Sequence, residues 1–186
     1  DEVCAEDPVA VAARQACLDD RRRELAAWLA AYQAPDRAAA ERALEAAEAL
    51  EPVAPCRNPR AVPSTINPIA VAAFDRELAE LVAALAAGRY VDVRARTETA
   101  VATARALGDR LREARALLVR GQVLLEGGDA AAAEPALFAA FTAASEVGDD
   151  YLAARAGLQQ IYAYGWRMTR VDDARRWAEL TRAIVV

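Results

Sequence analysis

The sequence lacks histidine altogether, and its 186 residues include only three cysteines and 6% aromatic residues. Without histidine, the commonest general base and the commonest nitrogen ligand for zinc are both missing. Cys4, Cys17 and Cys56 are 13 and 39 positions apart, unlike the close spacing of zinc ligands, and a three-thiol site would need a carboxylate as well. We therefore expect no metal, no cofactor and no nucleophilic catalytic site in this chain.

Basic clusters and long apolar runs are lacking too. The formal net charge is −5, and the arginines are spread along the sequence close to acids, which argues against nucleic acid as a partner. No apolar run is long enough to cross a bilayer, so we expect no membrane insertion of this segment. The chain begins at Asp1 without a signal peptide, which we interpret as an excised region or a processed product.

Apolar residues supply 55% of the chain, mainly as alanine and leucine, and this composition predicts an all-α protein. Chain breakers divide it into about eight helices. The first helix is expected from Pro8 to Tyr32, with Asp7 as N-cap. Its apolar side chains at helical spacing are Leu18, Leu25, Leu29 and Tyr32, with Trp28 alongside.

Three regions are expected along the chain. Residues 1–51 form an N-terminal helical hairpin, since the second helix, from 36 to about 50, follows the first after a very short link. Residues 52–67 form a Pro-rich connecting loop. Residues 68–186 form three further helix pairs.

An internal repeat with an offset of 40 residues supports the helix pairs. The segment ARALGD at 104–109 returns as ASEVGD at 144–149, and Gly88 returns as Gly128. The expected pairs are Phe74–Asp109, Arg110–Asp149 and Asp150–Val186. Glycines are placed at the helix ends, where a left-handed residue is needed, and aspartates follow as N-caps. These positions are Gly88, Gly108, Gly128, Gly148, Asp109, Asp129 and Asp149.

The repeat resembles the tetratricopeptide family. Small residues at positions such as Val93, Ala100, Gly121 and Ala140 are similar to those that let the two helices of such a repeat cross closely. The period is longer than the usual 34 residues, and the consensus Trp and Pro are missing. The resemblance covers roughly residues 70–186 and implies a right-handed superhelical solenoid that binds a protein or peptide in its concave face.

A second resemblance concerns the N-terminal third. The segments ACLDDRRREL at 16–25 and LEAAEALEPVAPC at 44–56, with AGRY at 87–90 and EVGDD at 146–150, resemble the extracytoplasmic helical region of membrane-anchored myxobacterial serine/threonine kinases. This implies a sensor or scaffold segment outside the cytoplasm. The chain has no kinase motif. The alternatives are a cytoplasmic repeat module of a transcription regulator or signalling ATPase, and a helical enzyme with an unrecognised pocket.

The cysteines allow a disulfide. If the first two helices are antiparallel, Glu51 returns level with Cys17, and Cys56 follows a few residues later. A Cys17–Cys56 bridge would then tie the Pro-rich loop to the first helix, although bridges from Cys4 are also feasible. The alternative is three reduced, buried thiols. The extracytoplasmic placement that the kinase resemblance implies favours the disulfide.

The tetratricopeptide resemblance also implies a peptide-binding groove along the first helix of each pair. Its expected members are Arg115, Gln122, Glu126, Arg155, Gln159, Tyr162 and Trp166. Arg115 and Arg155 are equivalent by repeat and could hold a peptide carboxylate, while the aromatic residues anchor apolar side chains. The alternative is that both arginines pair with nearby acids such as Glu113 or Asp150 on a solvated face.

Overall fold

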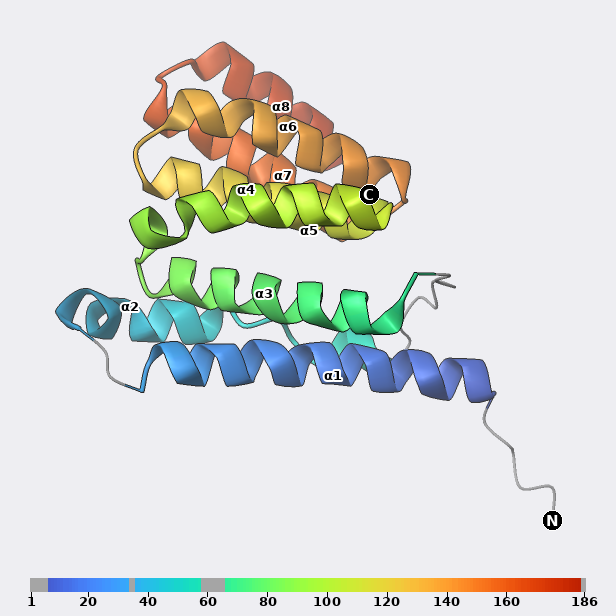
Figure 1. Cartoon of the computed structure of the whole chain (residues 1–186). Coiled ribbons are helices and arrows are strands. Elements are labelled where there is room, and N and C mark those ends of the chain that lie inside the picture. Colours follow the sequence, from blue (N-terminus) through green and yellow to red (C-terminus); the bar gives the residue numbers. More distant parts are fainter. Residues whose placement is uncertain (1–6, 34–35, 58–65, 185–186) are drawn as a thin grey trace. The chain divides into compact units, whose positions relative to one another are not determined.

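In the computed structural model the described residues, 7–33, 36–57 and 66–184, form helices joined by turns and short irregular segments, with no strand among them, and this confirms the predicted all-α class (Figure 1). The elements are α1 (Pro8–Ala31), α2 (Arg37–Glu48), the 3₁₀ turn η1 (Ala54–Arg57), α3 (Pro68–Ala86), α4 (Tyr90–Leu107), α5 (Arg110–Glu126), α6 (Ala130–Glu146), α7 (Asp150–Tyr162), the π-helical turn η2 (Ala163–Arg167) and α8 (Val171–Ile184). The second half of the Pro-rich loop lies outside the described residues.

The chain forms two compact units, residues 1–88 and 89–186. Unit 1 contains α1, α2, η1 and α3, and unit 2 contains α4 to α8 with η2. The boundary falls between the two helices of the first expected pair: α3 contacts α1 and α2, whereas α4 contacts α5.

The helices begin where the sequence places aspartate. The Asp7 carboxylate accepts the Val9 amide at 3.0 Å, and Asp109, Asp129 and Asp149 each accept the amide three residues further on, at 3.0, 3.2 and 2.9 Å. Each carboxylate thus satisfies a donor that the first helical turn leaves unpaired. The predicted N-caps are confirmed.

The repeated glycines end the helices as predicted. Gly88, Gly108, Gly128 and Gly148 have φ values of 81°, 67°, 85° and 67°. A Cβ atom is strained in this left-handed region, so glycine lets the chain reverse without cost. The sequence repeat with an offset of 40 residues therefore corresponds to a repeated structural unit of helix, turn and helix.

Unit 1 differs from the expected hairpin in how α1 packs. The contacts of α1 are with α3 and η1, and α2 contacts α3. The buried side chains of α2 are two alanines, Ala39 and Ala46, which offer little apolar surface, whereas α3 buries Phe74, Leu78 and Leu81. Helix α3 is therefore the better partner for α1.

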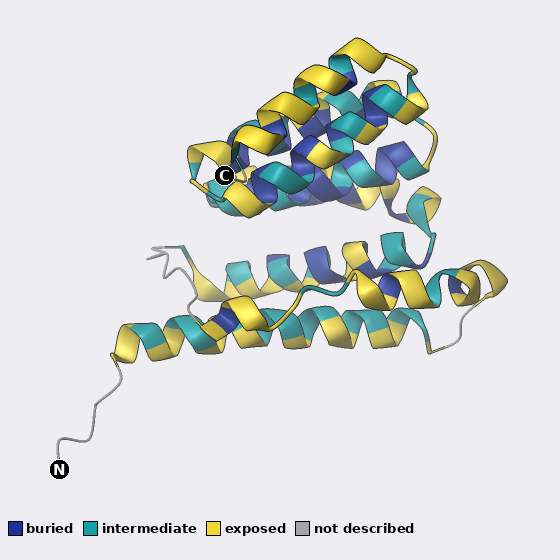
Figure 2. Cartoon of the chain, turned by 180° about the vertical axis from the view of Figure 1, so that it is seen from behind, coloured by how far each residue is buried: buried dark blue, intermediate teal, exposed yellow. Residues whose placement is uncertain are grey.

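The three leucines among the side chains predicted along α1 do not become buried in that contact, whereas Trp28 and Tyr32 are half-buried. Leu18, Leu25 and Leu29 stay exposed, and α1 has no buried residue at all (Figure 2). The side facing α3 is held by polar contacts instead. Arg23 lies 3.7 Å from Asp75, and the Tyr32 hydroxyl donates to the Ala86 carbonyl at 3.2 Å.

Unit 2 has the larger core. Its fully buried side chains include Leu124, Leu125 and Leu137, surrounded by alanines at the helix crossings. Helices α5 and α6 pack closely at Gly121, where an added Cβ would lie 2.3 Å from Leu137 Cδ2. The prediction that small residues bring these helices together is confirmed at this position.

A group of ion pairs joins three helices of unit 2. Glu113 on α5 is buried and accepts Arg105 of α4 and Arg110 of α5, both at 2.7 Å. Arg110 also reaches Glu146 of α6 at 2.6 Å. Burial raises the pKa of Glu113, but hydrogen bonds from Arg105 and Arg110 outweigh it, so the pKa lies below the usual 4.5.

This lowered pKa predicts acid destabilisation of unit 2. The unfolded chain binds the Glu113 proton more tightly than the folded chain, so the stabilisation is complete above pH 4.5 and is lost as the pH falls through the folded-state pKa. Glu113→Gln should cost about 1–3 kcal/mol at neutral pH and flatten the acid dependence. Urea unfolding of both proteins across acidic and neutral pH measures this, and parallel curves would contradict it.

Candidate functional site

One face of α7 gathers large side chains, of which Tyr151, Leu158 and Tyr162 are exposed and Arg155 is half-buried. Tyr151, Arg155, Leu158 and Tyr162 follow at spacings of four, three and four, which places them on one side of the helix. Tyr151 is 62% exposed and Leu158 is 58% exposed. The opposite side of α7 carries the buried residues Leu152, Ala153, Ala156, Gly157 and Gln160. One side of α7 therefore packs inside unit 2, and the other side is open to solvent.

Guanidinium groups lie over the two tyrosine rings of this face. Arg155 Cζ is 5.8 Å from the centre of the Tyr151 ring, and Arg167 Cζ is 5.8 Å from the centre of the Tyr162 ring. Such cation–π contacts hold long arginine side chains in defined positions. Exposed rings and positive charge therefore alternate along the face.

The π-helical turn η2 extends this face. It carries Trp166, which is 74% exposed, and Arg167, which donates to the Leu125 carbonyl near the C-terminus of α5. A cation is favourable at that end of a helix, where carbonyl groups are left without intrahelical donors. The contact anchors η2 to α5 and leaves the indole of Trp166 outside.

The α5 residues of the expected groove lie on one side of that helix. Arg115, Gln122 and Glu126 are seven and four positions apart and all are half-buried, and α5 contacts α7. Glu113, which the alternative interpretation offered as a partner of Arg115, is held by two other arginines. Within the described part of the chain, no hydrogen bond or ion pair involves Arg115.

A buried polar cluster fixes α7 and η2 to α6 from beneath. The Gln160 amide donates to the Glu134 carbonyl at 2.8 Å, and the Tyr164 hydroxyl donates to the Glu134 carboxylate at 2.9 Å. Burial and then the bond to Glu134 raise the pKa of Tyr164, which keeps its hydroxyl a donor. Arg170 covers the Tyr164 ring at 4.8 Å. These contacts therefore tie α7 and η2 to α6 beneath the exposed side chains.

We use the name binding face for one set of residues. The set consists of the expected groove residues and three further residues that the sequence did not indicate. Its members are Arg115, Gln122, Glu126, Tyr151, Arg155, Leu158, Gln159, Tyr162, Trp166 and Arg167. The missed residues are Tyr151, Leu158 and Arg167. The first two share the three-and-four spacing of Arg155 and Tyr162, so periodicity could have found them. Arg167 could not be found, because its position depends on the π-helical turn.

One surface pocket of the described residues lies on α8. Its lining residues are Arg175, Ala178, Glu179 and Arg182, all on α8. None of them belongs to the binding face.

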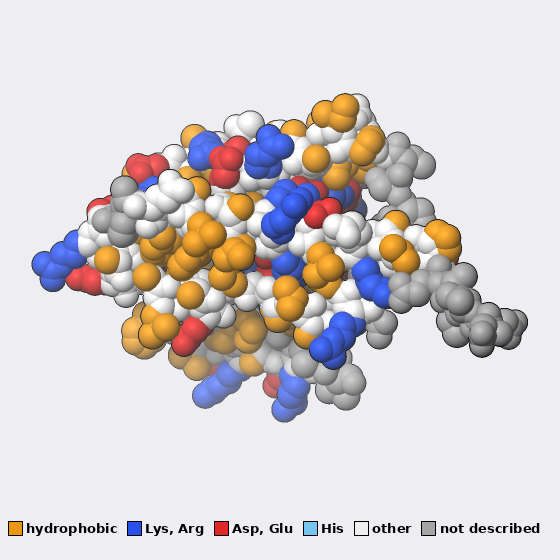
Figure 3. All heavy atoms as spheres, turned by 90° about the horizontal axis from the view of Figure 1, so that it is seen from below, with side chains coloured by type: hydrophobic (Ala, Val, Ile, Leu, Met, Phe, Trp, Pro, Cys, Tyr) orange, Lys and Arg blue, Asp and Glu red, His pale blue; other side chains and the backbone are white. Residues whose placement is uncertain are grey.

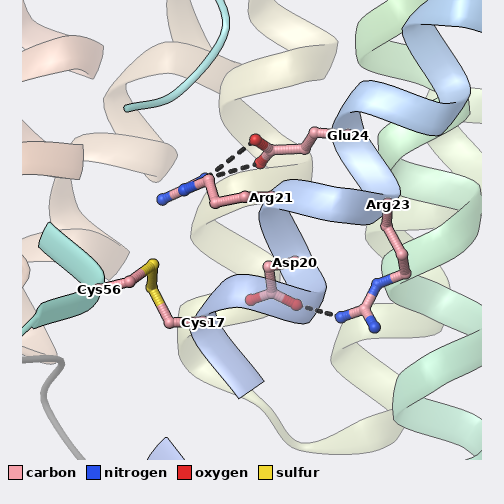
Figure 4. Close-up of a disulfide and its surroundings, with 6 residues drawn as sticks. All are labelled: Cys17, Asp20, Arg21, Arg23, Glu24 and Cys56. Carbon is pink, nitrogen blue, oxygen red and sulfur yellow. Dashed lines mark hydrogen bonds and ion pairs between the residues drawn. A yellow bond between two sulfur atoms is a disulfide. The ribbon is translucent and has the colours of Figure 1, made fainter. Parts of the chain in front are cut away.

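The predicted disulfide partners lie together. Cys17 of α1 and Cys56 of η1 have Cα atoms 5.5 Å apart and form a disulfide (Figure 4). Cys56 is buried, and next to it on α1 Arg21 makes two hydrogen bonds to Glu24, at 2.9 and 3.0 Å. The bridge thus ties the Pro-rich loop to α1. Cys4 lies outside the described residues.

The aromatic residue of α8 is engaged. Trp177 packs edge-on against Phe138 and Phe141 of α6, with ring centres 6.1 and 5.0 Å away. The outward positions of α8 carry charges such as Asp172, Arg175 and Glu179. Trp177 therefore holds α8 on α6 and is not available to a ligand.

The part of the chain that the structure describes contains no helix long and apolar enough to span a membrane, and no group of side chains arranged to hold a metal ion. Comparisons with family models, curated proteins and solved structures found no match to this chain. A function therefore has to be inferred from its own side chains.

Proposed function

We propose that this chain is a non-catalytic, protein- or peptide-binding helical module whose ligand lies on the binding face. The observation that carries the proposal is the row of exposed tyrosine, leucine and tryptophan side chains on α7 and η2, held from beneath by Gln160 and Tyr164. Large apolar surface is exposed at a cost, and aromatic residues on a rigid base are the usual anchors of protein interfaces. In this proposal α5–α6 and α7–α8 are successive tetratricopeptide-like hairpins of a solenoid.

The ligand is a peptide with acidic residues or a free C-terminal carboxylate. Arg115 has no acidic partner in the described part of the chain, and Arg155 is positioned over Tyr151. A guanidinium group binds a carboxylate with two parallel hydrogen bonds, which an amidated peptide end cannot match. Tyr162 and Trp166 would hold the apolar side chains of the same peptide.

The proposal places the module outside the cytoplasm, as a sensor or scaffold segment of a receptor-type serine/threonine kinase. The Cys17–Cys56 disulfide supports this placement, because structural disulfides persist in oxidising compartments. The kinase assignment rests on the sequence resemblance alone.

Replacing Trp166 by alanine should weaken binding of an acidic C-terminal peptide by about 30-fold, and Arg155→Ala by about 10-fold, typical of an aromatic anchor and a charged contact at an interface. Fluorescence polarisation with a library of labelled peptides, each with a free or an amidated C-terminus, provides the ligand and the measurement. Arg175→Ala, on the exposed surface of α8, is the matched control and should bind as the unmodified chain does.

Two outcomes would contradict the proposal. One is that no peptide of the library prefers the unmodified chain over the Trp166→Ala variant. The other is equal binding of free and amidated peptides together with no preference for peptides with acidic side chains, which would remove the carboxylate from the proposal and leave the aromatic anchors.

A further inference from the structure

Helix α1 presents an open face with a regular seam. Six exposed residues recur at alternating spacings of four and three, the pattern of positions d and a in a coiled coil. These seam residues are Val11, Gln15, Leu18, Arg22, Leu25 and Leu29. Four of them are apolar, and the exposed residues beside them include Ala12, Ala16, Ala26 and Ala30. Figure 3 shows hydrophobic side chains gathered on this side of unit 1.

The seam is unusual for a helix of this length. Helix α1 has 24 residues, which corresponds to about 36 Å, and its contacts with α3 and η1 bury none of them completely. Leu18 and Leu25 are each 45% exposed. Seven-residue repetition of leucine on the open side is a requirement for pairing with another helix, and packing against α3 does not need it.

The ends of the helix select the register of such a pairing. When two copies of α1 run antiparallel with residue n opposite residue 40 − n, nearly the whole of Pro8–Ala31 overlaps with itself. In the same register each position a meets a position d: Val11 faces Leu29, Gln15 faces Leu25, and Leu18 faces Arg22 of the second copy. The register that gives the longest overlap of the two helices is therefore also the register in which each position a packs against a position d. In a two-fold symmetric interface, each such contact occurs twice.

The charges of the seam favour the same orientation. Arg22 is the one cation of the seam and lies 3.2 Å from Asp19 of its own helix. In the antiparallel register, Arg22 of each copy also comes next to Asp19 of the other, so two arginines and two aspartates alternate around the symmetry axis. In a parallel pairing, Arg22 would face Arg22 of the second copy, which places like charges together in the seam.

From this charge complementarity and register we propose that the open face of α1 is a self-association surface, on which two copies of the chain form an antiparallel pair of α1 helices. This surface belongs to unit 1 and is independent of the binding face in unit 2. Gln15 and Arg22, the two polar residues among the six, weaken the apolar packing of the seam and specify its register. We therefore expect a dimer dissociation constant in the micromolar range.

Sedimentation equilibrium of the full chain over a concentration series tests the proposal. Cys4→Ser is included in every protein to exclude intermolecular disulfides. We expect a reversible monomer–dimer equilibrium, and the pair of substitutions Leu18→Glu and Leu25→Glu should raise the dissociation constant at least about 100-fold, because each dimer buries four of these leucines. Val91→Glu, at an exposed position of α4, is the matched control and should leave dimerisation unchanged.

Charge reversal tests the orientation. Arg22→Asp alone should weaken the dimer about 10-fold, since it places four acids around the axis, and adding Asp19→Arg should restore it. In a parallel pair, position 22 faces itself, so Arg22→Asp would only exchange one pair of like charges for another and should have little effect. Circular dichroism confirms that the variants remain helical.

Three results would overturn the proposal. The unmodified chain could stay monomeric at all concentrations, including the case in which another part of the same chain protects the seam. The Leu18→Glu and Leu25→Glu variant could dimerise normally. The double charge reversal could fail to restore the dimer, which would remove the antiparallel register.

Discussion

Reduction of the Cys17–Cys56 disulfide is expected to lower the free energy of unfolding of unit 1 by about 4 kcal/mol, the chain-entropy value for a closed loop of 39 residues. The loss should be large relative to the stability of this unit. Its longest helix has no buried residue, and α2 buries only two alanines. The apolar core of unit 1 comes mainly from α3, so the bridge is expected to be an important constraint that holds η1 on α1 and, through the chain, the end of α2.

Hydrogen exchange measured by mass spectrometry resolves this effect by segment. Amides of α2 and η1 should lose protection when Cys17 and Cys56 are both replaced by serine, or when the chain is reduced, whereas α5 and α6 serve as an internal reference. Thiol titration of the oxidised chain should find one reactive thiol, and Cys4→Ser should remove it without changing exchange. Equal protection in the oxidised and reduced chains would show that packing alone holds unit 1.

Gly121→Ala should destabilise unit 2 by about 1–3 kcal/mol through overpacking, even though alanine is the better helix former. The new Cβ would lie 2.3 Å from Leu137 Cδ2, and Leu137 is fully buried, so its side chain or the helices would have to shift. Leu137→Ala alone should cost about 2–5 kcal/mol because it leaves a cavity. Combined, the two changes should cost less than their sum, since the added methyl group enters the space that Leu137 vacates.

Urea unfolding of the four proteins in this double-mutant cycle gives the coupling between positions 121 and 137. Gly165→Ala is the matched control: its Cβ would lie 3.4 Å from the Ala174 side chain, an ordinary contact, so the substitution should be neutral or stabilising. If the two changes in unfolding free energy were strictly additive, α5 and α6 would be able to separate at this crossing. That result would contradict the close packing of Gly121 against Leu137.

The positions of the helices could be predicted from the sequence because their signals are local. Asp7 and Pro8 start α1. Gly108 ends α4, and Asp109 starts α5. A carboxylate that accepts an amide two or three residues later, and a glycine at positive φ, depend only on their near neighbours. The Cys17–Cys56 pair was likewise identified, as one of several pairings that the spacing left open.

The choice of partner helix could not be predicted in this way. The apolar positions of α1 were recognised, but the sequence does not say that α3, rather than α2, would contact this helix, or that the contact would use the side carrying Arg23 and Tyr32. Packing between segments depends on the sizes of all the facing side chains together and on links such as the disulfide. Leu18 and Leu25 are therefore open only because α1 was turned by its other contacts.

The same division holds for the binding face. The 40-residue repeat placed Arg115 and Arg155 at equivalent positions, and helical spacing placed Tyr162 near Arg155, since both are properties of a single chain segment. Helical spacing also allows the pairing of Arg110 with Glu113, three residues later on the same helix, whereas only the tertiary structure brought Arg105 of α4 to Glu113. Arg115 has no acidic partner in the described region. Only the π-helical turn brought Arg167 over Tyr162. The sequence by itself determined where helices begin, end and repeat. Which of their faces are buried and which are exposed was decided by packing between distant segments, because burial depends on the neighbours that each side chain meets in the folded chain.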